Sequence, residues 1–387
     1  MRVVILSDVF YPYLLGGGET RYWEIAKRLV KLGDEVTVLT SALKGMPRYE
    51  EPIEGLRIYR GGWSPHPLTH RSLLPVPGYV AWVLRSTRLL EDCDILDLNT
   101  YASAIAGLAL ARILGKPAVV TVHDVFSTAW LDGHNLAYGA LGTLSERLIA
   151  WLNMGGVFIT VSGASGRKIH LQLGVEKERI HVVPNGVDLG ALKGVSTRGG
   201  VTQRPKRVIY VGRLIGYKNV HHLLHVVQKL HERGLDVVLD VVGSGAERRK
   251  LELLCRELGV HERVRFHGFL ERKEDVYRLI SQADVLVNPS CFEGFSMVLL
   301  EALALGVPVV AYNLKAYEEF LVDNVNGLLV ARGDVGGLSD AVEEVLTNAG
   351  LAKNLSTEGM KTAERFDWMQ TTLRLRQVYE DVIRGFS

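Results

Sequence analysis

Residues 288–301, NPSCFEGFSMVLLE, combine two acids, a glycine turn and an apolar helix in a pattern that suits an anionic ligand. The segment leaves a predicted strand, turns through Glu293 and Gly294, and enters a helix that carries Glu301. Backbone N–H groups at a helix start bind phosphate, and glycine lets the backbone approach a ligand closely. A carboxylate on an apolar helix needs hydrogen-bond donors, which sugar hydroxyls supply. One glutamate alone is more typical of a solvated loop or a first helical turn, but the whole combination favours a ligand site.

Two cations follow another predicted strand. Residues 211–219, VGRLIGYKN, run from a strand end to a helix start and contain Arg213 and Lys218. Fixed guanidinium and ammonium groups stabilise the charge that a departing diphosphate gains in the transition state. Basic residues near strand ends are often simply solvated, and Arg213 alone is weak evidence. Together the two cations predict a diphosphate site.

Two segments of the first half are expected at the corresponding strand ends. Residues 15–19, LGGGE, follow the first strand and open a helix, where the N–H groups of Gly17 and Gly18 can approach phosphate oxygens. The GxGxxG spacing is absent, which argues against NAD. His123 ends a later strand, and its position suits a hydrogen bond to a sugar or acceptor hydroxyl as well as it suits capping its own loop.

Other patterns are interpreted as structural. Asp92-Cys93-Asp94 matches a metal-binding DxD pattern but precedes its strand, at the wrong edge of the sheet. Three histidines on one predicted helix lack the glutamate of an HExxH zinc site. The three cysteines show no CxxC spacing and are expected to be buried and reduced. No metal site and no cofactor other than the substrate is predicted.

The bulk composition is ordinary for a soluble globular protein. With 387 residues the chain is expected to form two domains. The net charge of +2 gives no field that would indicate nucleic acid as a partner. The first residues form a strand and not a signal peptide, and no apolar stretch approaches the ~20 residues of a membrane span. We therefore expect a cytoplasmic protein.

Short apolar runs alternate with segments of helical period, which is typical of parallel βα units covered by helices on both faces. In the first half, strands are predicted at 3–7, 35–40, 56–60, 95–98, 118–122, 157–161 and 180–183, with helices such as 19–32 and 102–114 between them. In the second half, strands are predicted at 207–211, 237–242, 264–267, 285–288, 308–311 and 327–330, and helices at 220–233, 246–258, 274–282, 297–305 and 337–347. Residues 368–383 form a last amphipathic helix.

The pattern predicts two doubly wound domains. The N-terminal domain spans residues 1–188, a Gly- and Ser-rich linker spans 189–205, the C-terminal domain spans 206–366, and the last helix falls within 367–387. Ligands bind at the carboxyl ends of the strands in open α/β sheets. The candidate residues all follow such ends, and we expect them around one crevice.

With these motifs placed, nearly the whole chain resembles the retaining glycosyltransferases of family 4, also called group 1. Seven residues separate Glu293 from Glu301, as in that family's EX7E motif. Gly212-Arg213 with Lys218 is similar to its diphosphate-binding pair, and residues 184–188, PNGVD, to its segment before the hinge. The match departs at residues 313–319, where the family usually has a glycine pair and a proline and this chain keeps only Glu319.

The resemblance implies a GT-B fold, in which an acceptor-binding N-domain faces a donor-binding C-domain and the last helix crosses back to the N-domain. It implies that Arg213, Lys218, Glu293 and His123 serve catalysis: the two cations hold the diphosphate, and His123 contacts the hexose near its 6-position. It implies donor contacts from Gly17, Gly18, Gly294, Phe295, Ser296, Met297 and Glu301, with Glu301 on the ribose.

The predicted reaction is metal-independent transfer of a hexose from a UDP- or GDP-sugar to a hydroxyl of a saccharide or lipid acceptor, with retained configuration. Two alternatives stay open, a nucleotide-sugar 2-epimerase and a non-catalytic sugar-nucleotide-binding protein. Residues 68–90, which include Trp82, Arg85 and Arg88, suit a peripheral membrane contact, although an ordinary helix and loop is the simpler interpretation. The oligomeric state does not follow from the sequence.

Overall fold

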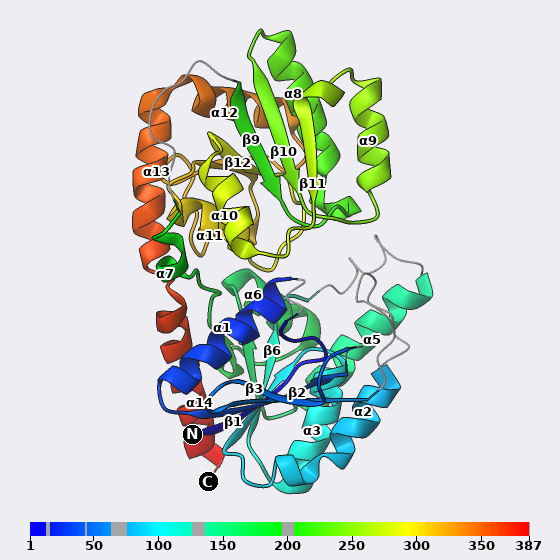
Figure 1. Cartoon of the computed structure of the whole chain (residues 1–387). Helices are drawn as coiled ribbons and strands as arrows, with labels where there is room; N and C mark the ends of the chain where they lie inside the picture. The colour runs from blue at the N-terminus through cyan, green and yellow to red at the C-terminus, as the bar shows by residue number, and fades with distance from the viewer. Residues whose placement is uncertain (13–15, 43–44, 63–75, 126–135, 196–204, 387) are drawn as a thin grey trace. The chain divides into compact units, whose positions relative to one another are not determined.

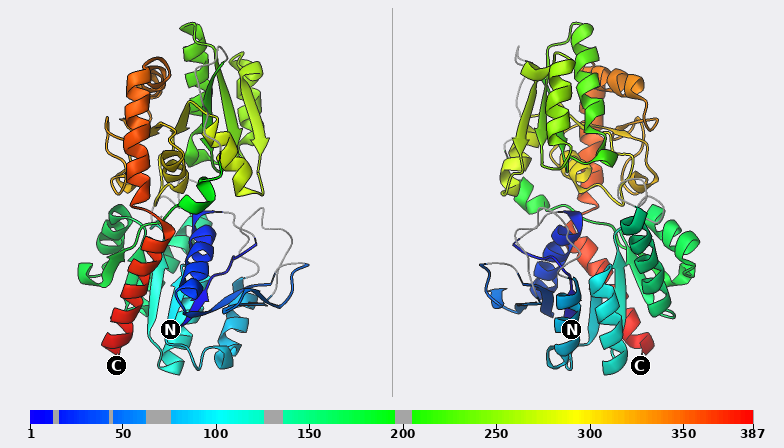
Figure 2. Two further views of the ribbon diagram at one scale, coloured as in Figure 1. Left: turned by 60° about the vertical axis from the view of Figure 1, so that its left-hand side comes forward. Right: turned by 90° about the vertical axis from the view of Figure 1, so that its right-hand side faces the viewer.

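The computed structural model of the chain describes residues 1–12, 16–42, 45–62, 76–125, 136–195 and 205–386. These residues form two compact units. Unit 1 comprises Met1–Asn185 and Trp368–Ser387, and unit 2 comprises Gly186–Asp367. Each unit is an α/β layer structure with helices on both faces of its sheet (Figures 1 and 2).

The described residues of unit 1 form an eight-stranded sheet in the order β3-β4-β2-β1-β5-β6-β7-β8. Its strands are β1 (Arg2–Leu6), β2 (Glu35–Ser41), β3 (Tyr49–Ile53), β4 (Leu56–Gly61), β5 (Ile95–Asn99), β6 (Ala118–Val122), β7 (Val157–Thr160) and β8 (Ile180–Val182). Only β3 runs antiparallel to its neighbour within this sheet. The helices are α1 (Gly17–Lys31), α2 (Val76–Arg85), α3 (Ala102–Leu114), α5 (Leu136–Leu152), α6 (Gly163–Leu173) and α14 (Trp368–Phe386).

The described residues of unit 2 form a six-stranded parallel sheet in the order β11-β10-β9-β12-β13-β14. Its strands are β9 (Lys206–Val211), β10 (Val237–Val242), β11 (Val264–Gly268), β12 (Val285–Asn288), β13 (Val309–Tyr312) and β14 (Leu328–Val330). The helices are α7 (Leu189–Leu192), α8 (Val220–Glu232), α9 (Arg248–Glu257), α10 (Lys273–Ser281), α11 (Met297–Ala304), α12 (Val335–Thr347) and α13 (Ala349–Glu364).

The central strands of both units are buried along their whole length. Every residue of β5, β10, β12 and β13 is buried. Runs of Val, Ile and Leu without alternation are what a sheet covered on both faces requires. The sequence prediction of two doubly wound α/β domains is therefore confirmed.

The C-terminal helix returns to unit 1, as the resemblance implied. Helix α14 packs against α1, and the Tyr379 hydroxyl donates to the buried carboxylate of Asp97 on β5. The Arg376 guanidinium donates to Asp34 at 2.9 Å, and Asp34 also accepts from the N-terminal ammonium of Met1 at 2.6 Å. Polar contacts thus join both ends of the chain to one sheet.

Three elements differ from the sequence prediction. One is helix α13 (Ala349–Glu364), because no helix was predicted between residues 347 and 368. Strand β3 was not predicted, because its sequence YEEPI is polar and contains a proline, which sheets tolerate at an edge. Helix α7 falls inside the predicted linker, where the Asp188 side chain caps it by accepting from the N–H of Ala191 at 3.0 Å. The rest of that linker, residues 196–204, lies outside the described residues.

Candidate active site

The loops that follow β9, β12 and β13 lie together in unit 2. These three strands are neighbours in one parallel sheet, and their carboxyl ends therefore share an edge. The loop after β9 carries Arg213 and Lys218, and the loop after β12 carries Glu293 and leads into α11. The structure thus places three of the four residues predicted to serve catalysis at one edge of one sheet.

Lys218 and Glu293 form an ion pair. The Lys218 ammonium donates to Glu293 Oε1 at 2.5 Å, and both side chains are largely buried. Asn288, the last residue of β12, directs its amide toward the same oxygen at 3.4 Å. The carboxylate is therefore held by one donor from the loop after β9 and one from the end of β12.

Arg213 reaches the same region through Tyr217. The Arg213 guanidinium donates to the Tyr217 hydroxyl at 2.6 Å, and it lies 6.0 Å from the centre of the Tyr217 ring. The Lys218 ammonium lies 5.7 Å from that ring centre. The Tyr217 ring thus lies beside both cations, a favourable arrangement for a π face.

Glycines let the backbones after β9 and β10 approach each other closely. A Cβ atom at Gly243 would lie 1.9 Å from the carbonyl oxygen of Gly212, and the φ of Gly243 is +135°. The N–H of Leu214 donates to the carbonyl of Ser244 at 2.9 Å, which fixes the loop that leads to Lys218. Glycine at 243 is thus required by both space and backbone conformation.

Helix α11 begins at this edge with free backbone donors. Ser296 is its N-cap residue, and the Ser296 hydroxyl accepts from the Asn288 amide at 3.2 Å. First-turn N–H groups have no intrahelical partner and form an anion site together with the helix dipole. Gly294, Phe295 and Met297, predicted from sequence as donor contacts, surround this helix start.

Glu301 lies one turn into α11. Its carboxylate accepts from the hydroxyl of Tyr277, on α10, at 3.2 Å. The sequence predicts that Glu301 needs hydrogen-bond donors, and the protein itself supplies one from Tyr277.

Two buried tyrosines lie beneath the site and were not identified from sequence. Burial first, and then the nearby Glu293 carboxylate, raise the pKa of Tyr210 and of Tyr317 well above the ordinary value. Tyr210 donates to the Arg213 carbonyl at 2.9 Å, whereas the hydroxyls of Tyr317 and Ser290 have no hydrogen-bond partner among the described residues. A buried tyrosine in a sequence looks like any other core residue, and no pattern distinguished these two.

In unit 1 the glycine segment and His123 come together. A Cβ atom at Gly18 would lie 3.1 Å from Nε2 of His123, and the structure therefore brings the start of α1 against the imidazole. Gly17 is the first residue of α1 and Gly16 its N-cap. The ring centres of His123 and Tyr22 lie 6.1 Å apart, with the two rings nearly perpendicular. Residue 15 of the predicted motif lies outside the described residues.

Asp124, next to His123, forms an ion pair with Lys168 on α6. Its carboxylate accepts from the Lys168 ammonium at 2.8 and 2.9 Å and from the Ser165 hydroxyl at 3.1 Å. Burial raises the pKa of this carboxyl above its ordinary value, and Lys168 opposes that effect. The pair anchors the strand end that presents His123.

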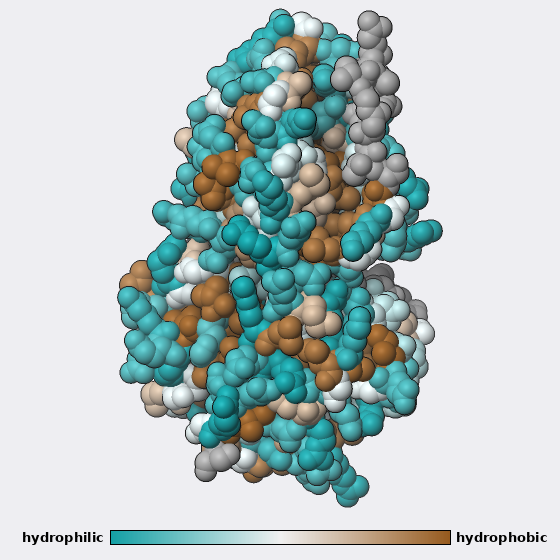
Figure 3. Space-filling model, turned by 90° about the vertical axis from the view of Figure 1, so that its left-hand side faces the viewer, coloured by the Kyte–Doolittle hydropathy of each residue, from teal (hydrophilic) through white to brown (hydrophobic). Residues whose placement is uncertain are grey.

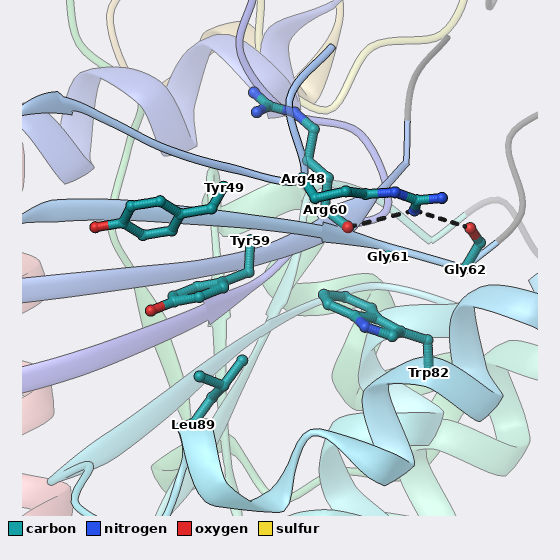
Figure 4. A pocket seen from close by; sticks show the side chains of 8 residues that line it. All are labelled: Arg48, Tyr49, Tyr59, Arg60, Gly61, Gly62, Trp82 and Leu89. Carbon is teal, nitrogen blue, oxygen red and sulfur yellow. Dashed lines mark hydrogen bonds between the residues drawn. The ribbon is translucent and has the colours of Figure 1, made fainter. Parts of the chain in front are cut away.

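A pocket of about 540 Å³ lies at the β3–β4 edge of unit 1 (Figure 4). Its lining includes Arg48, Tyr59 and Trp82. The Arg48 guanidinium donates to the carbonyls of Arg60 and Gly62 at 3.5 and 3.4 Å. A Cβ atom at Gly61 would lie 1.8 Å from the indole of Trp82. The pocket shares no residue with the site predicted from sequence.

The Asp92–Asp94 pattern lies at the opposite edge of the sheet of unit 1, whereas His222 lies in the first turn of α8, directly after the loop that carries Lys218. Asp94 accepts from the N–H of Arg2, at the amino end of the sheet of unit 1. His222 hydrogen-bonds the Tyr312 hydroxyl at 2.8 Å. Among the described residues, no group of three or more His, Cys, Asp or Glu side chains is arranged to hold a metal ion.

Two family descriptions match the chain and together span most of it. Residues 15–191 match Glycosyltransferase Family 4, and residues 197–362 match Glycosyl transferases group 1. The two matches correspond to the two sheets.

Curated relatives match over similar lengths. The glycogen synthase of Mycobacterium tuberculosis is 27% identical over 410 residues, which cover 100% of this chain and 96% of the relative. The phosphatidyl-myo-inositol mannosyltransferase of Mycobacterium leprae is 30% identical over 298 residues, which cover 76% and 75% of the two chains.

Solved structures show the same fold. Sucrose-phosphate synthase from Thermosynechococcus elongatus superposes with a TM-score of 0.83 at 21% identity and covers 100% of both chains. Anabaena HepE in complex with UDP-glucose superposes with a TM-score of 0.75 at 19% identity, covering 98% of this chain and 100% of that one. The chain therefore belongs to the group 1, or family 4, glycosyltransferases: it is a GT-B enzyme that transfers a sugar from a nucleotide sugar.

Proposed function

We propose that the chain transfers a hexose from a UDP- or GDP-sugar to a hydroxyl of a saccharide or lipid acceptor, with retained configuration and without a metal ion. The observation that carries the proposal is the Lys218–Glu293 pair beside Arg213, next to the free N–H groups of α11. Relatives with sugar-lipid names, such as the phosphatidyl-myo-inositol mannosyltransferase, support a lipid among the acceptor classes.

The cations and the acids bind different parts of the donor. Arg213 and Lys218 bind the diphosphate, whose charge attracts Lys218 away from its present partner. Glu293 then accepts hydrogen bonds from hexose hydroxyls, beside the N–H groups of residues 295–297. Glu301, with one oxygen on Tyr277, binds the ribose hydroxyls through its remaining acceptor positions.

Unit 1 binds the acceptor, and it also contributes contacts to the donor. His123 contacts the hexose near its 6-position, and Gly18 gives the imidazole room because a side chain there would press on Nε2. Gly17 and Gly18 bring the start of α1 close to the donor phosphate.

The reaction follows from this arrangement. The bond between the anomeric carbon and the phosphate oxygen breaks while the acceptor oxygen attacks on the same face. The departing phosphate oxygen takes the proton of the acceptor hydroxyl, which keeps the proton balance without a protein base. Arg213 and Lys218 stabilise the growing charge on the diphosphate, and for that reason no metal ion is needed.

The first experiment identifies the donor. A thermal-shift screen against UDP-, GDP- and ADP-sugars detects the nucleotide sugar that raises the melting temperature, since a ligand that binds only the native state stabilises it. Stabilisation by an ADP-sugar alone would contradict the proposed donor class.

The second experiment tests the cations. Arg213→Ala and Lys218→Ala should each lower the rate of nucleoside diphosphate release from that donor by roughly 100-fold or more, because each removes a preorganised charge. Lys353→Ala removes an exposed cation on α13 and serves as the control. Near wild-type turnover in both site variants, with unchanged melting temperatures, would refute the assigned role. Turnover that EDTA abolishes would refute metal independence.

A further inference from the structure

The pocket at the β3–β4 edge of unit 1 has the size of a ligand site. Its volume of about 540 Å³ falls within the range of small-molecule sites in proteins, roughly 300–1,000 Å³. Its lining combines aromatic and aliphatic side chains with two arginines and two glycines: Arg48, Tyr49, Tyr59, Arg60, Gly61, Gly62, Trp82 and Leu89 (Figure 4). A mostly apolar wall with a few polar groups is typical of a site that binds a small molecule.

Two tyrosine rings stand on neighbouring strands at this pocket. Tyr49 of β3 lies directly opposite Tyr59 of β4 in the strand register, and their ring centres are 5.0 Å apart. The two ring planes are inclined by 48°. A flat nucleobase stacks on one of two inclined planes, whereas the chair of a pyranose presents C–H groups in several directions and contacts both. The tyrosine pair therefore suits the apolar face of a sugar ring.

The indole of Trp82, on α2, adds a third ring. A Cβ atom at Gly61 would lie 1.8 Å from this indole, and glycine at the end of β4 thus lets the ring lie directly on the backbone. Trp82 is half-buried, and Figure 4 shows it beside Tyr59 along the same wall of the pocket. The aromatic surface therefore extends past a single ring and suits more than one sugar.

Trp82 belongs to residues 68–90, the stretch whose sequence suits a peripheral membrane contact. Residues 68–75 lie outside the described residues. In the described remainder Tyr79 and Val83 are buried in the core of unit 1, and the membrane contact stays a prediction. Trp82 is the ring that this helix offers to the pocket.

Arg48 has no acidic partner among the residues that the structure describes. The Arg60 guanidinium donates to Glu50 at 2.5 Å and to the Tyr11 carbonyl at 2.8 Å, and its charge is thereby paired. The Arg48 guanidinium donates to the backbone carbonyls of Arg60 and Gly62, both times through Nη1. Its Nε and Nη2 groups remain as donors, and its charge favours an anionic group on the ligand.

A second, more polar pocket of about 250 Å³ adjoins the first, because Tyr59 and Leu89 line both. Arg88 lines this second pocket, is exposed, and forms no ion pair within the described part of the chain. The two other arginines of its lining pair with Glu35 and Asp92. A ligand that extends past Tyr59 thus meets a second cation that no acid neutralises.

We propose that these two adjoining pockets, the edge site, bind a short acidic oligosaccharide. Its sugar rings lie on Tyr49, Tyr59 and Trp82, and its carboxylates bind Arg48 and Arg88. The edge site shares no residue with the candidate active site and holds a saccharide on unit 1 without reacting with it. The proposal rests on the proposed function for the class of ligand alone, since an enzyme that transfers sugars meets saccharides as acceptors and products.

The experiment measures binding of tetragalacturonate and of its neutral methyl ester to the full chain by isothermal titration calorimetry, without any nucleotide sugar. The wild type should bind the acid roughly tenfold more tightly than the ester, because carboxylates form charge-assisted hydrogen bonds with guanidinium groups. Arg48→Gln should remove most of this difference and leave the affinity for the ester within roughly twofold of the wild type. Arg147→Gln removes an exposed arginine of α5 in the same unit and is the matched control.

The aromatic rings are tested separately. Tyr59→Ala should weaken binding of both probes roughly fivefold or more, because a stacking surface is lost. Tyr49→Ala removes a ring that is 47% exposed at the sheet edge, and it should weaken both probes even if Tyr59→Ala lowers the melting temperature. Hydrogen–deuterium exchange locates the contact in the wild type: bound tetragalacturonate should slow the exchange of backbone amides within residues 46–62.

Three results would overturn the proposal. One is an absence of wild-type binding to either probe. Another is binding of the acid that Arg48→Gln and both tyrosine variants leave unchanged. The third is protection from exchange that spares residues 46–62. Because no donor is present, each of these results leaves the proposed transfer reaction untouched, and a chain without transferase activity would still show the binding.

Discussion

At the scale of single residues, the site holds its charges in balance before any donor arrives. Lys218 neutralises Glu293 in a largely buried position, where an unpaired charge is costly. A diphosphate that attracts Lys218 frees the carboxylate for sugar hydroxyls. Donor binding and the availability of Glu293 are therefore linked in the proposed mechanism.

A second residue-scale feature is expected to lower the stability of unit 2 in acid. Burial, followed by the neighbouring His221 and His225, lowers the pKa of His222 to about 4. An unfolded histidine titrates near pH 6.5, and the folded state resists the proton that the unfolded state takes up. The stability that neutral His222 contributes is present above pH 6.5 and should be lost as the pH falls toward 4.

Thermal melting from pH 7 to pH 4 measures this loss. His222→Gln should show a smaller fall in melting temperature over that range than the wild type. His261→Gln, at an exposed histidine of unit 2, is the control and should follow the wild type. If the melting temperatures of all three proteins fell equally with pH, His222 would not contribute to the loss of stability in acid.

At the scale of elements, the loops after β9 and β10 depend on glycine. Gly243→Ala would place a Cβ atom 1.9 Å from the Gly212 carbonyl oxygen, at a φ of +135°. The backbone would have to move, and we expect a loss of more than about 2 kcal/mol in the free energy of unfolding. Urea denaturation measures this loss.

Gly216→Ala is the matched control for that change. A Cβ atom at Gly216, in the same loop region as Lys218, would meet nothing within 4 Å. Its effect on stability should be within about 0.5 kcal/mol, as for ordinary surface substitutions. Equal losses in the two variants would show that the close approach at Gly243 is not what limits stability.

At the scale of the whole molecule, the last helix completes the core of unit 1 rather than that of the unit that precedes it in sequence. Asp97 lies in the middle strands of the sheet, and burial raises its pKa above the ordinary value despite donors from Tyr379, Thr121 and Tyr22. Tyr379 is the donor that comes from α14. This buried network joins residues that are 282 positions apart in the chain.

Tyr379→Phe tests that connection. The variant keeps the ring but leaves one oxygen of the buried carboxylate without this donor, which should cost about 1–3 kcal/mol of unfolding free energy. Arg374→Ala, on the exposed side of the same helix, should cost little. Urea denaturation of both variants decides the matter, and a Tyr379→Phe curve that overlays the wild type would show that packing alone holds α14.

The sequence by itself determined most of the strands and helices and the two-domain α/β fold. It also determined which loops carry Arg213, Lys218 and Glu293, and that Glu301 lies on the helix that follows. Hydrophobic periodicity and turn residues depend only on neighbouring positions in the chain, and they can therefore be identified in the sequence alone. Strand β3 was not predicted, because pairing at the edge of a sheet does not require apolar residues.

Only the tertiary structure decided which of these residues meet and which faces stay uncovered. The Lys218–Glu293 pair joins residues 75 positions apart, and its formation depends on β9 and β12 lying side by side in the sheet. In the sequence, Tyr210, Ser290 and Tyr317, which lie beneath Glu293, look like any other core residues. An apolar face predicts that a helix is amphipathic, but whether that face is buried depends on what packs against it.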